Sequence, residues 1–222
     1  YPHPQGYPPL RELLSQKLKL ERDISVEADD IILADGSSQP IHMAIESLID
    51  PGDVVITEDF VYSGTLTTLR RFRADVRGVP CDDSGMTPDG LEREILASIA
   101  KNGIPPKMVY TIPTFQNPQG WTMSLGRRKS LLTLCQRYSI PILEDDCYVD
   151  LRFDGKTAPS IHSLDESGIV IYVGSFSKII APGMRMGYMT GPHEILEAVK
   201  SIKSGGGVNQ FAALAIHRYA TS

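Results

Sequence analysis

Short apolar runs alternate with helical patterns along this chain, and this alternation restricts the fold more than any other feature of the sequence. The apolar runs are short and rich in β-branched residues, whereas the longer stretches repeat apolar residues with the 3.6-residue period of a helix. The apolar runs span residues 31–34, 54–57, 76–79, 108–112, 140–144, 169–173 and 186–189. The helical patterns span residues 10–20, 41–49, 66–72, 91–100, 125–138, 195–202 and 211–219.

Regular alternation of strand and helix predicts an α/β fold. Strands that are apolar throughout are typical of a mostly parallel sheet covered on both faces by helices. We therefore expect a three-layer α/β/α architecture with a mostly parallel, seven-stranded sheet, formed by residues 1–222 as one domain. Because the chain starts at Tyr1 without a methionine and reaches residue 222 inside a helical pattern, we also expect it to be part of a longer polypeptide.

Charge and composition argue against several classes of partner. The formal net charge is -5 and the basic residues are scattered, which is unlike the basic face of a nucleic-acid-binding protein. No apolar run approaches the ~20 residues of a membrane span, and no signal peptide begins the chain, so we expect a cytoplasmic protein with no membrane partner. The three cysteines, without C-x-x-C spacing, favour neither a disulfide framework nor a zinc site.

Polar residues cluster directly after most of the predicted strands. In open α/β sheets, ligands bind outside the carboxyl ends of the strands, so these clusters should meet along one edge of the sheet. The clusters are Asp35–Ser38, Glu58–Tyr62, Pro113–Pro118, Asp145–Tyr148 and Gly174–Lys178.

Two of these clusters suggest an anion site and a reactive amine. Gly36, Ser37 and Ser38 lie where a strand ends and a helix begins, and free amides at a helix N-terminus bind anions. They form neither a nucleotide P-loop nor a G-x-G-x-x-G fingerprint. Lys178 follows another strand and could form a Schiff base, and the nearby Arg185 can offer paired donors to a phosphate.

The acidic run of residues 144–146 allows two interpretations, a Mg²⁺ site or a single functional carboxylate. Glu144 and Asp145 should point to opposite faces of the strand, which weakens the metal interpretation, and we expect no metal site. Asp145 could instead face a cationic ring nitrogen. Asn117 and Tyr148 supply neutral hydrogen-bonding groups, and Tyr62 supplies a flat face for stacking. An anion site, an amine, a carboxylate and an aromatic ring on one edge together describe a site for pyridoxal 5'-phosphate (PLP).

The motifs at these positions resemble those of a known family. They resemble the large domain of fold-type I, class I/II PLP-dependent aminotransferases, particularly the branch with aminoadipate and kynurenine aminotransferases and the effector domains of MocR-type regulators. The resemblance runs from a Tyr1–Gly6–Leu10–Arg11 opening to the helices after Arg185. It depends on the sequences P-T-F-Q-N-P-Q-G at residues 113–120, E-D-D-C-Y at 144–148, G-S-F-S-K at 174–178 and P-G-M-R-M-G-Y at 182–188.

The resemblance implies a role for each residue at the predicted edge. Lys178 would form the Schiff base, Asp145 would pair with the pyridinium nitrogen, and Tyr148 would join them as a catalytic residue. The implied cofactor-binding residues are Gly36, Ser37, Ser38, Tyr62, Asn117, Asp145, Tyr148, Ser175, Ser177, Lys178 and Arg185. Asn117 and Tyr148 would hold the cofactor's phenolic oxygen, Tyr62 would stack on its ring, and the serines and Arg185 would surround its phosphate. Ser38 stands where the family usually has glutamine, so the side-chain contact to the phosphate at that position is open.

The resemblance favours an aminotransferase that moves an amino group between an amino acid and a 2-oxo acid. A lyase or decarboxylase on the same fold, or the PLP-binding effector domain of a transcription regulator, remain alternatives. The resemblance also implies a homodimer in which Tyr1 reaches the phosphate of the neighbouring subunit, and a smaller C-terminal domain, absent here, that grips the substrate carboxylate. Arg127, Arg128 and Arg218 lie on helical patterns away from the strand ends, so we expect them on the solvated surface instead.

Overall fold

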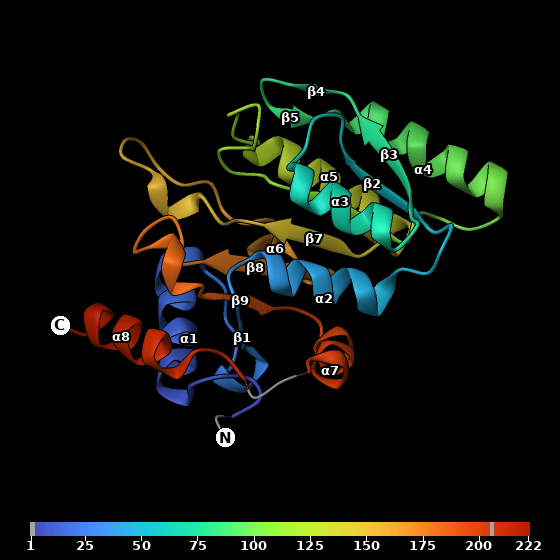
Figure 1. Ribbon diagram of the computed structural model, residues 1–222. Helices are drawn as coiled ribbons and strands as arrows, with labels where there is room; N and C mark the ends of the chain where they lie inside the picture. Colours follow the sequence, from blue (N-terminus) through green and yellow to red (C-terminus); the bar gives the residue numbers. More distant parts are fainter. Residues whose placement is uncertain (1–2, 205–206) are drawn as a thin grey trace.

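A seven-stranded sheet forms the centre of the molecule (Figure 1). The computed structural model describes residues 3–204 and 207–222. Tyr1, which the family resemblance singled out, lies outside the described residues. The strand order is β1-β9-β8-β7-β6-β2-β3. The strands are β1 (Ile32–Ala34), β2 (Val54–Glu58), β3 (Asp75–Val79), β6 (Met108–Thr111), β7 (Ile142–Asp145), β8 (Val170–Ser175) and β9 (Gly187–Thr190).

The sheet is mostly parallel, as predicted. Strands β3, β2, β6, β7 and β8 pair in parallel, and β9 pairs antiparallel with both β8 and β1. Strand β1 therefore runs in the same direction as β8, and all strands except β9 end on the same edge of the sheet. This edge is where the sequence predicted that the polar clusters would meet.

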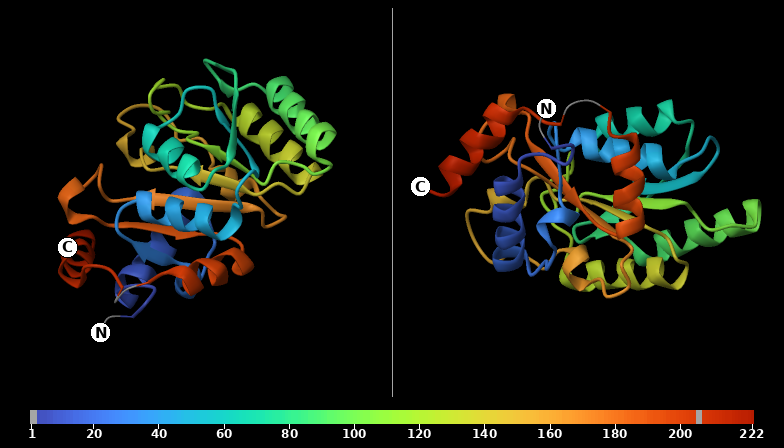
Figure 2. Two further views of the ribbon diagram at one scale, coloured as in Figure 1. Left: turned by 45° about the vertical axis from the view of Figure 1, so that its right-hand side comes forward. Right: turned by 90° about the horizontal axis from the view of Figure 1, so that it is seen from below.

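Helices cover both faces of the sheet and complete a three-layer α/β/α fold (Figure 2). Apolar residues of α2, α3 and α7 pack on one face against Ile32, Leu143 and Val173. Helices α4, α5 and α6, together with α1 and α8 near β1, cover the other face. The helices are α1 (Pro8–Arg22), α2 (Ser38–Leu48), α3 (Ser63–Arg71), α4 (Pro88–Asn102), α5 (Leu125–Arg137), α6 (Ile161–Leu164), α7 (His193–Ile202) and α8 (Gln210–Ala220).

Local sequence signals account for several helix starts. Pro88 opens α4 after Thr87, where its fixed φ suits the first turn and its missing N–H costs nothing. Ser124 caps α5 by accepting a hydrogen bond from the Arg127 amide at 3.3 Å. Both helices therefore begin where the sequence carries a recognised start signal.

Two features of the fold differ from the sequence analysis. A short hairpin, β4 (Cys81–Asp82) and β5 (Gly85–Met86), forms a separate two-stranded sheet that was not predicted, because two-residue strands leave no periodic pattern. The expectation for Arg128 was wrong: the residue is 0% exposed, and its guanidinium donates to the carbonyls of Pro113, Met123 and Pro159.

The other two arginines on helical patterns behave differently from Arg128. Arg127 is half-buried and donates to the carbonyls of Gly85 and Met86, so it is not the free surface residue that we expected either. Arg218 is exposed, as predicted. A helical pattern shows which face is apolar, but it does not reveal a guanidinium that enters the protein to bind loop carbonyls.

Within the described part of the chain, no helix is both long and apolar enough to cross a membrane.

Candidate active site

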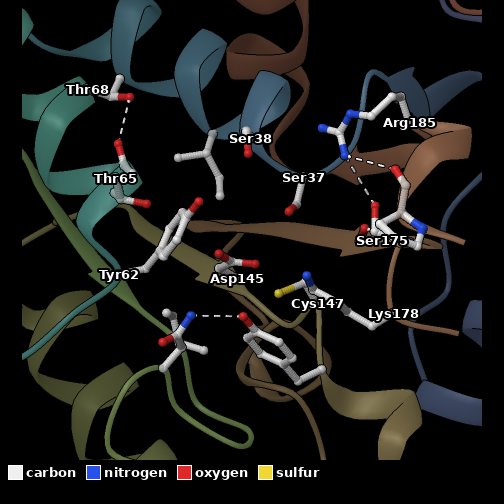
Figure 3. Close-up of a pocket in the computed structure, with 17 residues that line it drawn as sticks. Ser37, Ser38, Tyr62, Thr65, Thr68, Asp145, Cys147, Ser175, Lys178 and Arg185 are labelled. Carbon is white, nitrogen blue, oxygen red and sulfur yellow. Dashed lines mark hydrogen bonds between the residues drawn. The ribbon is translucent and has the colours of Figure 1, made fainter.

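A cavity of about 400 Å³ opens at the edge of the sheet where the parallel strands end. The structure brings all of the predicted site residues except Gly36 into its lining, including the side chains of Tyr62, Asp145 and Lys178 that Figure 3 shows around one space. The predicted residues that line it are Ser37, Ser38, Tyr62, Asn117, Asp145, Tyr148, Ser175, Ser177, Lys178 and Arg185.

Asp145 is the last residue of β7 and lies at the bottom of this cavity. Its side chain is buried, and its Oδ2 accepts a 2.8 Å hydrogen bond from the hydroxyl of Tyr110 on β6. Its Oδ1 has no hydrogen-bond partner among the described residues. Burial raises the pKa of Asp145 to about 6, although the Tyr110 hydrogen bond opposes this rise.

Glu144 points away from the cavity, as the strand alternation predicted. Its carboxylate accepts hydrogen bonds from the amides of Ile161 and His162 at 2.8 and 2.9 Å, and it lies 3.8 Å from Arg128. It is therefore a buried structural group on the opposite face of the sheet. No cluster of three or more potential metal ligands occurs among residues 3–204 and 207–222.

Asn117 and Tyr148 lie together on one wall of the cavity. The Asn117 amide donates to the Tyr148 hydroxyl at 3.0 Å, and burial raises the pKa of Tyr148 to about 12. Lys178, in the loop after β8, has an exposed side chain whose Nζ lies 5.8 Å from the centre of the Tyr148 ring. The phenol thus stays protonated at neutral pH, and the amine and the phenol can reach the same ligand.

Arg185 and two serines form a corner suited to an anion. Arg185 donates to the Ser177 hydroxyl at 3.5 Å and to the Asp35 carbonyl at 2.9 Å, and the Ser177 amide donates to the Ser175 hydroxyl at 3.1 Å. Gly36 lies just behind this corner, where a Cβ atom would be 2.3 Å from the Arg185 guanidinium. Gly36 therefore contributes by giving Arg185 room rather than by lining the cavity.

The first turn of α2 completes the anion corner. Ser37 and Ser38 line the cavity at the start of this helix, where backbone amides have no partner within the helix. The Gln39 side chain turns away, because its Oε1 accepts a hydrogen bond from the Asp35 amide at 2.8 Å. The residue next to Ser38 therefore does not replace the glutamine side chain that is usual in the family.

Tyr62 precedes α3 and presents its ring to the cavity. Gly64 makes this position possible, since a Cβ atom there would lie 2.4 Å from the Tyr62 ring. Thr65 and Thr68 line the cavity from the same helix and were not predicted. Residues three apart share one face of a helix, so the spacing of Tyr62, Thr65 and Thr68 was a signal that could have identified both threonines.

Further lining residues were also missed, among them Ile41, Ile112 and Cys147. Ile41 and Ile112 carry no polar group and look like ordinary core residues in the sequence, and both line the cavity with apolar surface. Cys147 lies within a predicted cluster but was given no role. Burial next to Asp145 raises the pKa of its thiol, so it remains a thiol at neutral pH.

The three-layer fold and this cavity agree with the class of protein that the sequence motifs resemble, the fold-type I PLP-dependent transferases. The comparison with protein families is more specific. A family model described as "Aminotransferase class I and II" matches residues 1–219. The chain belongs to this aminotransferase family.

Individual relatives include both enzymes and a regulator. Aromatic-amino-acid aminotransferase 1 of Thermococcus litoralis is 41% identical over 192 residues, which are 86% of this chain and 46% of that protein. The uncharacterized HTH-type transcriptional regulator YisV of Bacillus subtilis is 33% identical over 218 residues, covering 96% of this chain and 44% of that protein.

A solved structure supports the same fold. The crystal structure of Pyrococcus horikoshii kynurenine aminotransferase, in complex with PMP, kynurenine substrates and KYA products, has a TM-score of 0.93 and 36% sequence identity. The match covers 100% of this chain and 55% of that one. The chain thus spans about half the length of these relatives.

Proposed function

We propose that this chain is the cofactor-binding large domain of a PLP-dependent aminotransferase. The observation that supports this most strongly is the arrangement of one cavity, in which a buried carboxylate, an amine and an anion corner face the same space. Asp145, Lys178 and Arg185 supply these three groups. Their spacing around a cavity of about 400 Å³ suits a ligand with a cationic ring, an aldehyde and a phosphate.

The chain's own residues fit PLP at each of its polar groups. The buried Oδ1 of Asp145, which has no partner among the described residues, is free to accept the ring N–H. Arg185, Ser175, Ser177 and the start of α2 would hold the phosphate. Asn117 and Tyr148 would bind the phenolic oxygen, and Tyr62 would lie against the ring. Lys178 is the one lysine in the cavity lining and would attach the cofactor's aldehyde carbon.

Transamination needs a proton to leave the substrate carbon that carries the amino group and to be delivered to the aldehyde carbon of the cofactor. PLP, when bound, supplies an electron-withdrawing ring that stabilises the negative charge formed there. Once the substrate's amino group has displaced it from the cofactor, the Lys178 Nζ would accept this proton and deliver it to the aldehyde carbon, because it is the one amine in the cavity lining among the described residues. Asp145 would keep the ring nitrogen protonated, and the Tyr148 hydroxyl would orient the reacting groups. The substrates would be an amino acid and a 2-oxo acid.

The rest of the polypeptide would complete the enzyme. Since the chain spans about half of its relatives, we propose that a smaller domain beyond residue 222 binds the substrate carboxylate. We also propose a cytoplasmic homodimer in which Tyr1 contributes to the partner's phosphate site. Leu20, Phe60, Phe153 and Phe211 are each more than 60% exposed, and the proposed assembly would cover apolar surface of this kind.

Turnover by the whole polypeptide tests this function. The PLP-loaded protein should convert a panel of amino acids and 2-oxo acids through repeated cycles, with one amino acid formed for each one consumed. Lys178→Ala should abolish turnover, and Lys129→Ala, on an exposed turn of α5, should not. Borohydride reduction followed by peptide mapping should place the cofactor on Lys178. Release of CO₂ or of an unsaturated product instead would point to a decarboxylase or lyase.

The relationship to YisV supports one second candidate, a PLP-binding effector domain of a transcription regulator. Such a domain would share every cofactor-binding residue named above. The two candidates differ in what precedes residue 1 and in catalysis. A helix-turn-helix upstream, together with amine-dependent DNA binding and no multiple turnover, would identify the regulator.

A further inference from the structure

Tyr110 connects the buried side of Asp145 to the rest of the protein. It lies on β6, next to β7 in the sheet, and its side chain is 0% exposed. Its hydroxyl donates to Asp145 Oδ2 at 2.8 Å, and the Thr65 hydroxyl on α3 donates to the Tyr110 oxygen at 3.1 Å. Three elements of the fold therefore meet at one carboxylate.

The hydrogen bonds that link Thr65, Tyr110 and Asp145 can run in only one direction. An ionised carboxylate only accepts hydrogen bonds, and a tyrosine hydroxyl has one proton to give. Tyr110 must therefore donate to Asp145, and Thr65 must donate to Tyr110. As a result Oδ2 is held, whereas Oδ1 has no partner among the described residues.

Cys147 lies near the same carboxylate but leaves Oδ1 without a hydrogen-bond partner in the described part of the chain. Its thiol and backbone amide lie close enough to Asp145 to lower the pKa of the carboxyl group as weak donors, but neither reaches Oδ1 with the geometry of a hydrogen bond. Figure 3 shows the Asp145 carboxylate at the cavity, between Tyr62 and Cys147. The oxygen available to a ligand is therefore the one that Tyr110 does not hold.

We propose that Tyr110 is a positioning residue, which holds Asp145 so that Oδ1 accepts the ring N–H of PLP and the proton stays on the ring. This proposal depends on the proposed cofactor, but not on transamination. Without the Tyr110 hydroxyl, Asp145 could rotate and would lose a donor that stabilises its ionised form. The proton shared with the ring nitrogen would then move toward the carboxylate.

Tyr172 offers a matched control on the neighbouring carboxylate. It is also 0% exposed, and its hydroxyl donates to Asp146 Oδ2 at 3.2 Å. Asp146 does not line the cavity. Tyr172→Phe thus removes the same kind of buried tyrosine–aspartate hydrogen bond, with a similar cost in stability, and leaves the Tyr110–Asp145 hydrogen bond in place.

The experiment compares PLP with 1-deaza-PLP, in which carbon replaces the ring nitrogen, on the whole polypeptide. Tyr110→Phe should weaken PLP binding about tenfold and 1-deaza-PLP binding less than twofold, because only PLP contacts Asp145 through a ring N–H. With ¹⁵N-labelled PLP, the bound ring-nitrogen resonance should move toward that of unprotonated pyridine. Tyr172→Phe should change neither measurement.

Equal weakening of both ligands by Tyr110→Phe, or an unchanged ¹⁵N resonance, would overturn the proposal. If Tyr110→Phe does not fold, Thr65→Val tests the same chain of groups. Thr65→Val should also weaken PLP binding more than 1-deaza-PLP binding, by a smaller factor than Tyr110→Phe. Equal weakening of both ligands would again contradict the proposal. If Tyr110→Phe weakens PLP binding more than 1-deaza-PLP binding in a protein that shows no turnover, the aminotransferase proposal is rejected and this inference is retained. No PLP binding by the unaltered protein would reject both.

Discussion

Asp145 shows how one side chain can be found from sequence while its environment cannot. Its place after an apolar run predicted a position at the sheet edge, because parallel strands end together. The same argument located Lys178 and Asn117. Tyr110 and Thr65 were missed because their contribution is made behind Asp145, and a tyrosine inside an apolar strand has the same sequence pattern as a core aromatic residue.

The charge of Asp145 is the first quantity to test. Asp145→Asn keeps the shape of the side chain but removes the negative charge that would hold the ring proton. Turnover should fall by at least about a hundredfold, while PLP remains bound through the phosphate corner. Steady-state kinetics and a PLP binding titration measure the two effects separately. Activity of the unaltered protein that disappears with EDTA and returns with Mg²⁺ would instead support the metal interpretation.

At the scale of elements, Arg128 joins α5 to the loop that carries Asn117. Its guanidinium donates to Pro113, Met123 and Pro159 carbonyls at 3.0–3.1 Å, and the side chain is fully buried. The strands and helices around it were predicted correctly, since each has its own periodic pattern. The arginine was placed wrongly because its partners are loop carbonyls, which any sequence can supply and which leave no signal.

Arg128→Met should therefore be strongly destabilising. The variant removes the Arg128 donors to the Met123 and Pro159 carbonyls and one of the two donors to the Pro113 carbonyl, and it leaves Glu144 without its cationic neighbour, at a cost of about 3–5 kcal/mol. Arg137→Met is the control on the same helix, because Arg137 is exposed and pairs with Glu92 at 3.1 Å. It should change the free energy of unfolding by less than ~1 kcal/mol. Urea denaturation measures both, and equal midpoints for the two variants would contradict this account of Arg128.

Glu58 joins β2 to β6 through a buried carboxyl group. Its Oε1 accepts a hydrogen bond from the Thr111 hydroxyl and one of 2.9 Å from the Ile112 amide. Burial raises its pKa from 4.5 to about 7. The folded protein therefore binds a proton that the unfolded chain releases, so stability is greatest below pH 4.5 for this group and is lost as the pH rises to about 7.

Glu58→Gln should remove this pH dependence, because the amide keeps the acceptor oxygen but cannot ionise. We expect the melting temperature of the variant to rise relative to the unaltered protein between pH 5 and pH 8. For one proton, the free energy of unfolding changes by at most about 1.4 kcal/mol per pH unit. Glu166→Gln, at an exposed position, serves as the control and should show no such trend. If the difference in melting temperature between Glu58→Gln and the unaltered protein is the same at every pH in this range, Glu58 is not a buried, proton-binding group.

At the scale of the whole molecule, this chain gathers most of the residues of the proposed cofactor site around one cavity but spans about half of its relatives. The fold and most of the site were predictable because both depend on strand order and on residues next to strand ends. The homodimer was expected only from the family resemblance and stays a prediction, since the evidence for an assembly lies in surfaces that a single chain leaves exposed. Phe153 and Phe211, 92% and 87% exposed, carry no signal in the sequence that separates an interface from solvent.

The segment before α1 makes the assembly testable. It is fixed to the edge of the sheet, where the Leu33 amide donates to the Gln5 carbonyl at 2.8 Å and Lys203 donates to the Pro4 carbonyl at 2.7 Å. Tyr1 lies four residues before Gln5 in the sequence. We expect the whole polypeptide to be a homodimer by light scattering, with each Tyr1 completing the phosphate site of its partner.

Mixed dimers separate a contact within one chain from a contact between chains. Tyr1→Phe should weaken PLP retention in the homodimer, because it removes one hydroxyl from the phosphate site. In a heterodimer of Tyr1→Phe and Lys178→Ala chains, the working site belongs to the Tyr1→Phe chain, and the intact Tyr1 belongs to its partner. PLP retention at that site should therefore return to the level of the unaltered protein. If the site keeps the full Tyr1→Phe defect, the tyrosine acts within its own chain and the two sites are not shared.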